Sequence, residues 1–162
     1  MMKIELVPVT DEDVTPLTRI MKRAFDKDCQ LHTGRDGGPP GYDNGDFIRT
    51  WVFHQYATSF KILVDEKLAG NISLFINSRT NVNVLGNFFI DPDFHSCGIG
   101  TRVWAMIEEK YPETIKWKTE TIWQSSYNHY FYVTKCGFHI VHIDNPLNNP
   151  EAQYHMEKNM PL

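Results

Sequence analysis

The stretch that most constrains this chain is DPDFHSCGIGTRVW, residues 91–104, which places two glycines between two apolar runs. The run before it, NVNVLGNFFI at 81–90, predicts a strand, and Ile99, Val103 and Ile107 after it are spaced for one face of a helix. Glycines at a strand-to-helix turn let the backbone approach a ligand closely. The first turn of a helix also offers free N–H groups and a partial positive charge. The stretch therefore predicts a phosphate site, with a tight turn at a helix start as the structural alternative.

Two common phosphate loops do not fit these residues. A nucleotide-hydrolase loop requires Gly-Lys-Ser/Thr, whereas Gly100 is followed by Thr101 and Arg102. A dinucleotide-binding fold requires a third glycine and an acidic residue about 20 positions further on, and neither fits well. The segment HSCGIGT, residues 95–101, remains able to cradle a pyrophosphate through its backbone N–H groups.

The rest of the chain mixes strands and helices without strict alternation. We expect strands at 3–9, 81–90, 114–122, 138–143 and 152–159, and a hairpin at 60–77 that turns at residues 65–67. We expect helices at 15–28, 47–56, 99–111 and 125–136, and a Gly-, Pro- and Asp-rich loop at 33–46. This order predicts an α/β fold, in which a mixed sheet carries helices on both faces.

Composition narrows the function. The 162 residues suit a single domain, 1–162. A net charge of −4 without a Lys/Arg cluster argues against a nucleic-acid partner. No run approaches the roughly 18 apolar residues of a membrane span, and the first residues lack a signal-peptide core. Three scattered cysteines and histidines without a ligand-like spacing lead us to expect reduced thiols, no metal and a cytoplasmic location.

Two segments resemble motifs of the GCN5-related N-acetyltransferase (GNAT) family, and the order of elements resembles it over nearly the whole chain. The first family motif is Gln/Arg-x-x-Gly-x-Gly/Ala after a strand that ends in hydrophobic-x-Pro. Here the strand ends at Ile90-Asp91-Pro92, and the motif positions hold His95, Gly98 and Gly100. Histidine replaces the usual Gln/Arg, which leaves any ligand contact of that side chain open.

The second family motif is Asn…Phe-Tyr-x-x-x-Gly-Phe, and it matches Asn128, Phe131, Tyr132, Gly137 and Phe138. This chain has one extra residue between the tyrosine and Gly-Phe. A gapless alignment from Gly137 would put Val133 at the tyrosine position. We favour Tyr132, because the upstream half of the motif is then intact, and we expect the extra residue to form a bulge in the last helical turn.

The resemblance implies a GNAT-like acyl-CoA N-acyltransferase fold with a central, mostly antiparallel sheet. It implies direct transfer of an acetyl group from acetyl-CoA to an amine in a ternary complex. The resemblance implies that the main chain of Phe88, Phe89 and Ile90 binds the pantetheine arm of the cosubstrate. It implies that the pyrophosphate is bound by the loop His95, Ser96, Cys97, Gly98, Ile99, Gly100 and Thr101. Asn128 would contact the pantetheine arm or the phosphates, and Arg102 and Lys135 are the candidates for the 3′-phosphate.

For catalysis, the resemblance implies Tyr132 as general acid toward the coenzyme A thiolate. The general base stays open among Glu120, Asp91, Asp43, Asp46 and a chain of water molecules, and Glu120 is our choice.

Tyr42 and Asp43 belong to the loop that lines the acceptor pocket in relatives, so they are candidate substrate-binding residues. The acceptor is a small-molecule or peptide amine, and a homodimer is an open expectation. The rival hypothesis is a non-catalytic acyl-CoA-binding sensor or regulatory module.

Overall fold

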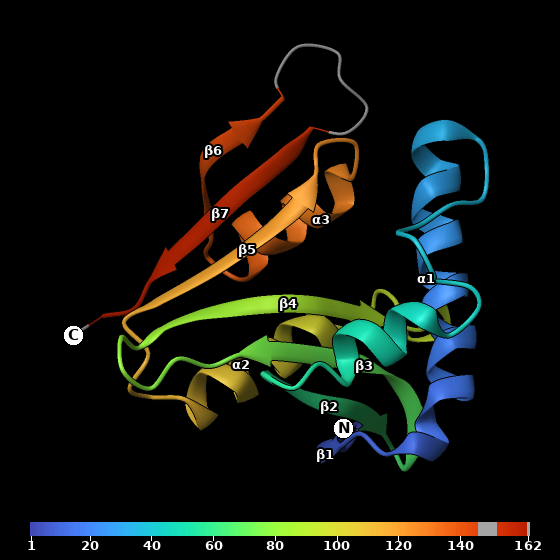
Figure 1. Cartoon of the computed structure of the whole chain (residues 1–162), viewed down its shortest axis with the longest axis horizontal. Helices are drawn as coiled ribbons and strands as arrows, with labels where there is room; N and C mark the ends of the chain where they lie inside the picture. Colours follow the sequence, from blue (N-terminus) through green and yellow to red (C-terminus); the bar gives the residue numbers. More distant parts are fainter. Residues whose placement is uncertain (146–151, 162) are drawn as a thin grey trace.

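The structure is a computed structural model that describes residues 1–145 and 152–161. One seven-stranded sheet runs through it in the order β1-β2-β3-β4-β5-β7-β6 (Figure 1). Its strands are β1 (Ile4–Pro8), β2 (Ala57–Val64), β3 (Lys67–Phe75), β4 (Val82–Ile90), β5 (Lys116–Ile122), β6 (His139–Asp144) and β7 (Gln153–Asn159). Every neighbouring pair is antiparallel except β4 with β5, which is parallel. The predicted mixed sheet is therefore confirmed.

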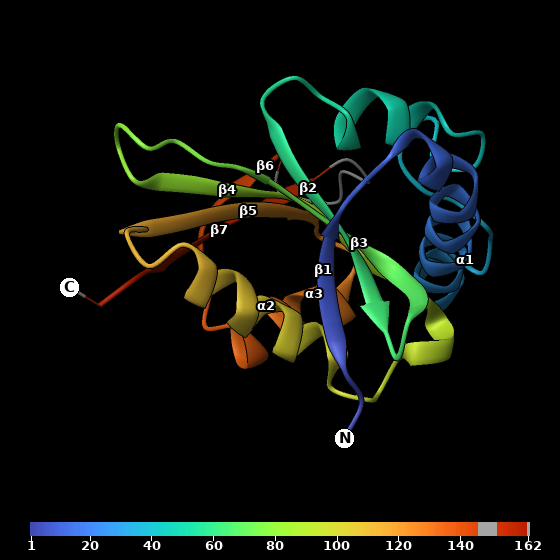
Figure 2. The ribbon, with the colours of Figure 1, turned by 90° about the horizontal axis from the view of Figure 1, so that it is seen from below.

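Helical segments cover both faces of this sheet, as the sequence predicted (Figures 1 and 2). The first face carries α1 (Val14–Thr33) and the π-helical turn η2 (Ile48–Val52). The second face carries α2 (Ile99–Lys110), α3 (Ser126–Tyr130) and its π-helical continuation η4 (Phe131–Lys135). Short 3-10 turns, η1 (Asp11–Asp13) and η3 (Pro92–Phe94), precede α1 and α2.

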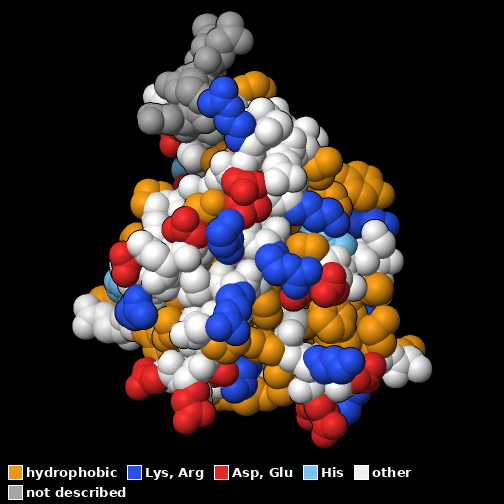
Figure 3. All heavy atoms as spheres, turned by 90° about the vertical axis from the view of Figure 1, so that its right-hand side faces the viewer, with side chains coloured by type: hydrophobic (Ala, Val, Ile, Leu, Met, Phe, Trp, Pro, Cys, Tyr) orange, Lys and Arg blue, Asp and Glu red, His pale blue; other side chains and the backbone are white. Residues whose placement is uncertain are grey.

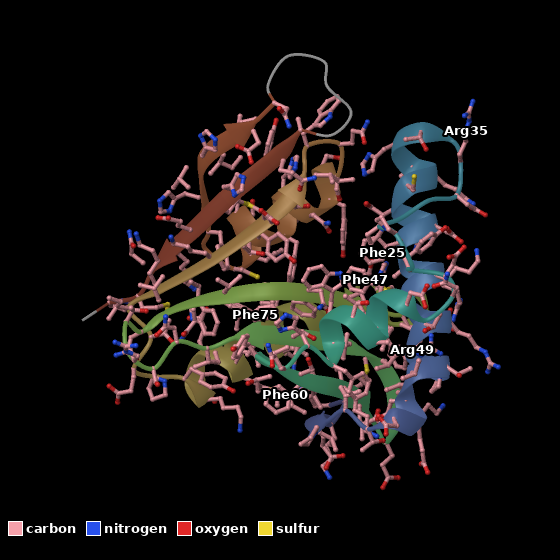
Figure 4. All side chains as sticks on the ribbon, in the orientation of Figure 1. Phe25, Arg35, Phe47, Arg49, Phe60 and Phe75 are labelled. Carbon is pink, nitrogen blue, oxygen red and sulfur yellow. The ribbon has the colours of Figure 1, made fainter. Side chains whose placement is uncertain are left out.

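Two apolar clusters fix the helices on the sheet. On the first face, Leu17 and Met21 of α1 and Ile48 of η2 pack with Phe89 of β4. Phe25 and Phe47, labelled in Figure 4, pack against the same cluster. The second cluster is larger and includes two indole rings that meet edge to face at 73°. They belong to Trp104 in α2 and Trp117 in β5, and their centroids lie 5.0 Å apart. Helix α2 is thus anchored to β5, and α1 to β4.

The predicted hairpin is confirmed, but its turn has two residues instead of the expected three, because Lys67 already belongs to β3. Asp65 and Glu66 both have positive φ, 48° and 68°, between the end of β2 and the start of β3. The expected helix over 47–56 is wrong in length. Residues 46–52 are helical, the last five, Ile48–Val52, as a π turn, and Phe53 leaves the helical region with φ −97° and ψ 15°.

The junction of β4 and β5 is the feature that shapes the site. These strands share only the register pairs Val82–Lys116, Asn83–Trp117 and Val84–Lys118 in the described chain. Gly86 is an extra residue in β4, because Leu74 pairs with Leu85 while Ser73 pairs with Asn87. Beyond this bulge the strands diverge (Figure 1), and we call the space between residues 85–90 and 119–122 the wedge.

The outer surface is mixed in charge on the side that carries α1, where acidic and basic side chains are interspersed (Figure 3). Within residues 1–145 and 152–161, no helix combines the length and apolar character that crossing a bilayer requires.

Candidate functional site

A cavity of about 500 Å³ lies beside the wedge, at residues 88–90 of β4. Its walls come from α1, β4, the loop before α2, the first turn of α2, and α3 with η4. Most of the predicted cosubstrate residues line it: Phe88, Phe89, Ile90, His95, Ser96, Gly98, Ile99, Gly100, Thr101, Asn128, Tyr132 and Lys135. The structure therefore brings together the two motifs, which lie in separate parts of the sequence.

One end of the cavity is formed by the glycine loop and the start of α2. Ser96 and Gly98 both have left-handed backbone, with φ of 64° and 73°, so the chain turns sharply before the helix. The first helix-type bond runs from the N–H of Arg102 to the carbonyl oxygen of Gly98 at 3.2 Å. The N–H groups of Ile99, Gly100 and Thr101 precede that bond and are the unpaired first-turn donors of α2. A phosphate placed there meets N–H groups and the positive end of the helix.

The two glycines serve different purposes. Gly98 requires glycine because of its positive φ, and a Cβ at this position would find no atom within 4 Å. A Cβ on Gly100 would lie 3.0 Å from the ring of Phe131, so Gly100 allows α2 to pack closely under η4. The cavity therefore has unfilled space beside Gly98, while the contact between Gly100 and Phe131 leaves no space between α2 and η4.

His95 ties this loop to the end of β4. Its Nε2 lies 3.0 Å from the carbonyl oxygen of Ile90, and its ring stacks on Tyr127 with centroids 6.0 Å apart. Burial of the imidazole lowers the pKa of His95, which favours a neutral ring that donates from Nε2 to the carbonyl. The histidine therefore braces the loop from within, a role that the Gln/Arg of the family motif does not suggest.

The extra residue of the second motif is accommodated as the sequence predicted. The N–H of Cys136 donates to the carbonyl oxygen of Phe131 at 3.0 Å, five residues back, which is the bond of a π turn. Tyr132 lines the cavity and is only 8% exposed, whereas Val133 is 40% exposed and is not part of the wall. Tyr132, and not Val133, is thus the residue that lines the cavity.

The environment of Tyr132 is apolar. Its ring packs against Phe131 and Phe138, with centroids 5.3 and 5.8 Å away. Burial raises the pKa of the Tyr132 phenol above its ordinary value, so the hydroxyl stays protonated at neutral pH.

Three other predicted residues lie outside the cavity wall. Cys97 is exposed on the loop, and the guanidinium of Arg102 donates to the carbonyl oxygen of Met2 at 2.9 Å. Arg102 is therefore engaged at the N-terminal end of the chain and not at the wedge. Glu120 lies on the first face of β5, with its carboxylate 3.4 Å from Nδ1 of His155.

Tyr42 is an anchor of the loop that contains it. Its hydroxyl donates to Oδ1 of Asp26 at 2.6 Å, and the N–H of Gly37 donates to the same oxygen at 3.1 Å. Burial opposes ionisation of Asp26, but hydrogen bonds from Lys22 and Tyr42 outweigh it and lower the pKa of the carboxyl group. The bonds from Tyr42 and Gly37 fasten the loop to α1, while the neighbouring Asp43 is exposed and does not line the cavity.

The wall that α1 provides for the cavity was not predicted from the sequence. Ala24, Phe25 and Asp28 line the cavity from this helix. Oδ1 of Asp28 accepts a hydrogen bond from Oγ of Ser125 at 3.1 Å, which joins α1 to the residue that caps α3. Because these residues are 97 positions apart, no local pattern predicts their contact.

Within residues 1–145 and 152–161, no group of three or more His, Cys, Asp or Glu side chains is placed to hold a metal ion.

Comparison with known proteins agrees with this arrangement. Residues 17–138 match the acetyltransferase (GNAT) family, so the chain belongs to that family. A crystal structure of an acetyltransferase from Thermus thermophilus has a TM-score of 0.76 at 14% identity and covers 98% of this chain and 97% of its own. The PaiA N-acetyltransferase of Thermoplasma acidophilum, solved in complex with coenzyme A, has a TM-score of 0.73 at 17% identity, covering 98% and 100%.

A relative with closer sequence is the uncharacterized protein YrkN of Bacillus subtilis (strain 168). It is 43% identical over 103 residues, which are 64% of this chain and 54% of YrkN. The aligned part thus spans about half the length of that relative.

Proposed function

We propose that this chain transfers an acetyl group from acetyl-CoA directly to an amine. The observation that carries the proposal is the cavity lined by the end of β4, beyond its divergence from β5, by α3 with η4, and by the first turn of α2 with its free N–H groups. Such a cavity offers an anion site at one end and strand edges along its length. The complex of PaiA with coenzyme A supports the choice of ligand, because that protein shares this fold.

In this proposal, the pyrophosphate of acetyl-CoA lies on the N–H groups of Ile99, Gly100 and Thr101. The pantetheine arm follows the main chain of Phe88 to Ile90 into the wedge, where its amides pair with the unpaired edge of β4. Lys135 lines the cavity and provides a positive charge for the 3′-phosphate. The amide of Asn128 lies 3.3 Å from Oγ1 of Thr121, which fixes it at the opposite wall.

The chemical step forms a C–N bond and breaks the C–S bond of the thioester. A neutral amine attacks the acetyl carbonyl, and the coenzyme A thiolate leaves. Tyr132 holds a proton in the wall of the cavity and donates it to the thiolate, or hydrogen bonds to it. The ammonium form of the acceptor first loses one proton to Glu120 through water on the first face of the sheet. After the C–N bond forms, the nitrogen loses a second proton to water, and Tyr132 regains from water the proton that it gave to the thiolate. A lysine-type amine has a reference pKa near 10.4, so it needs such an acceptor before attack.

A matched pair of glycine substitutions tests the cosubstrate site. Gly98 and Gly34 have nearly the same positive φ, 73° and 74°, and a Cβ on either would meet no atom within 4 Å. Gly98→Ala and Gly34→Ala should therefore lower the free energy of unfolding equally, by about 1 kcal/mol. Only Gly98→Ala should weaken acetyl-CoA binding in calorimetric titration, because Gly98 borders the cavity and Gly34 does not. Equal affinities for acetyl-CoA would count against the proposed site.

A panel of amines then separates an enzyme from an acyl-CoA sensor. Thiol release from acetyl-CoA should depend on an added amine, such as spermidine, a lysine-containing peptide or a peptide with a free N-terminus. Binding of acetyl-CoA without thiol release for any amine would favour the regulatory module.

A further inference from the structure

A buried polar network lies beneath η2 on the first face of the sheet. Asn71 and Ser73 of β3 are fully buried. They connect to Asn87, which directly follows the bulge of β4. Burying three polar side chains in an apolar layer is costly unless their hydrogen bonds are satisfied. The neighbouring donors and acceptors therefore determine the orientation of the Asn71 and Asn87 amides.

The orientation of Asn71 follows from its backbone neighbours. One end of its amide lies 3.2 Å from the carbonyl oxygen of Phe60, and the other end lies 3.3 Å from the N–H of Ile72. Only an NH₂ group can bond to the carbonyl, and only an oxygen can accept from the N–H. The reverse orientation would place oxygen against oxygen and nitrogen against nitrogen. Nδ2 of Asn71 therefore donates to Phe60, and its Oδ1 faces Asn87.

Asn71 then orients Asn87. The two amides are 2.8 Å apart, and because Asn71 presents an oxygen, Asn87 must present its NH₂ group. The amide oxygen of Asn87 is left without a partner among the residues that the structure describes, and the side chain is half-buried. The network thus fixes one free acceptor on the first face of β4.

This acceptor lies next to the wedge. The hydroxyl of Thr119 donates to the carbonyl oxygen of Leu85 at 3.0 Å, which marks the point where the strands separate. Asn87 follows Leu85 after the single extra residue Gly86, and Glu120 follows Thr119. Asn87 pairs with Ser73 on the first face, and Glu120 lies on that same face of β5. The two side chains therefore flank the wedge from opposite strands.

We propose that the amide oxygen of Asn87 accepts a hydrogen bond from the nitrogen of the acceptor amine and so orients its lone pair toward the thioester. This inference rests on the proposed acetyl transfer. An amide oxygen binds an N–H but does not take up its proton at neutral pH, so Asn87 positions the amine while the proton leaves to the base. Holding one N–H in a fixed direction aligns the nucleophile, and this alignment lowers the barrier to attack.

The test uses the full chain and the amine of the panel that the wild type acetylates fastest. Asn87→Ala should lower kcat/KM for the amine about tenfold, the scale of one hydrogen bond, and leave KM for acetyl-CoA unchanged. Asn87→Asp keeps an acceptor oxygen toward the amine. Its other oxygen would face Oδ1 of Asn71, which Phe60 and Ile72 hold in place, so a lower Tm is expected alongside the kinetics. This variant should recover most of the lost kcat/KM, which a merely structural role of Asn87 would not explain.

The matched control is Asn83→Ala. Asn83 is a buried asparagine of the same strand, and within the described residues its amide bonds only to Thr114 and Asn77, at 2.7 and 2.8 Å. This variant should lower Tm without changing kcat/KM for the amine.

The possible results have distinct meanings. Wild-type kinetics in Asn87→Ala, or an equal loss in Asn83→Ala, would overturn the role of Asn87 and leave the proposed transfer standing. Failure of Asn87→Asp to recover activity would also overturn it. A wild type that acetylates no amine of the panel would overturn the proposed function first, and this inference with it.

Discussion

The hydroxyl of Thr119 is bonded to the carbonyl oxygen of Leu85 at 3.0 Å, and both residues are buried. This side-chain bond takes over where the backbone pairs of β4 and β5 stop at Val84 and Lys118. It therefore holds the narrow end of the wedge at a fixed width.

Replacing Thr119 by valine keeps the shape of the side chain and removes this bond. Thr119→Val leaves the carbonyl oxygen of Leu85 buried without its side-chain donor, so the free energy of unfolding should fall by about 1–2 kcal/mol. Urea unfolding measures this change. A control is Thr58→Val, at a partly exposed strand position far from the wedge. If the free energy of unfolding falls equally in both variants, the bond between Thr119 and Leu85 does not stabilise the fold more than an ordinary strand position does.

Tyr132→Phe tests the proton donor. Because burial holds the phenol in its protonated form, the variant should lose kcat by about tenfold to a hundredfold, with little change in KM for acetyl-CoA. The pKa is raised above its ordinary 10.0, so the phenol itself should add no basic limb to the pH–rate profile below that pH. Val133→Ala is the control, since Val133 is not part of the cavity wall. Unchanged kcat in Tyr132→Phe would assign the proton to solvent.

Glu120→Gln tests the general base. The variant should lower kcat about a hundredfold at neutral pH, as loss of a positioned proton acceptor does. Its match is Glu157→Gln, because Glu157 lies on the same face and is bound by Lys116 at 3.0 Å. Equal rates in the two variants would return the choice to Asp43, Asp46, Asp91 or water. Asp91 is the weaker of these alternatives, since Arg23 already binds its carboxylate at 2.9 Å.

Tyr42→Phe tests the anchor of the loop through its pH dependence. The folded pKa of Asp26 lies below its ordinary 3.8, so its stabilising contribution is present above pH 3.8 and is lost as the pH falls through the folded pKa. The variant should be about 1.5 kcal/mol less stable at neutral pH, the scale of a hydrogen bond to a charged group. This difference should shrink in urea unfolding as the pH is lowered below 3.8.

Tyr56→Phe serves as the control for that measurement, because Tyr56 is 72% exposed. If the unfolding free energies of wild type and Tyr42→Phe differ by the same amount at neutral pH and below pH 3.8, the Asp26 carboxylate does not have the proposed role.

The sequence predicted the parts of the site that are local. Glycines between a strand and an apolar helix indicate a phosphate site without reference to distant residues. A one-residue insertion in a helical motif likewise indicates a bulge in the helix. The π turn that brings Tyr132 to the cavity was therefore foreseeable from residues 128–138. The family resemblance added the ligand, which the spacing of Gly98 and Gly100 alone does not identify.

The remaining features depend on contacts between distant segments. The contact of Asp28 with Ser125 and the network of Asn71 with Asn87 join residues that no periodicity relates. The expected helix over 47–56 failed for a similar reason. Its apolar residues, among them Ile48 and Val52, pack against α1, and a single π turn already buries them. Sequence patterns alone do not indicate how few residues a segment needs to satisfy its packing.

Because β4 and β5 diverge beyond Val84 and Lys118, each strand has an edge that is not paired with the other. An exposed edge is normally a place where a second chain adds a strand, and proteins protect such edges to stay monodisperse. Here α1 is bonded to the cap of α3 through Asp28 and Ser125 and forms one wall of the cavity. This wall blocks the addition of a strand from a second chain but leaves room for a narrow ligand that carries amide groups. The sheet is in this sense incomplete on its own, and the cosubstrate proposed to pair with its open edge is consumed and replaced at every turnover.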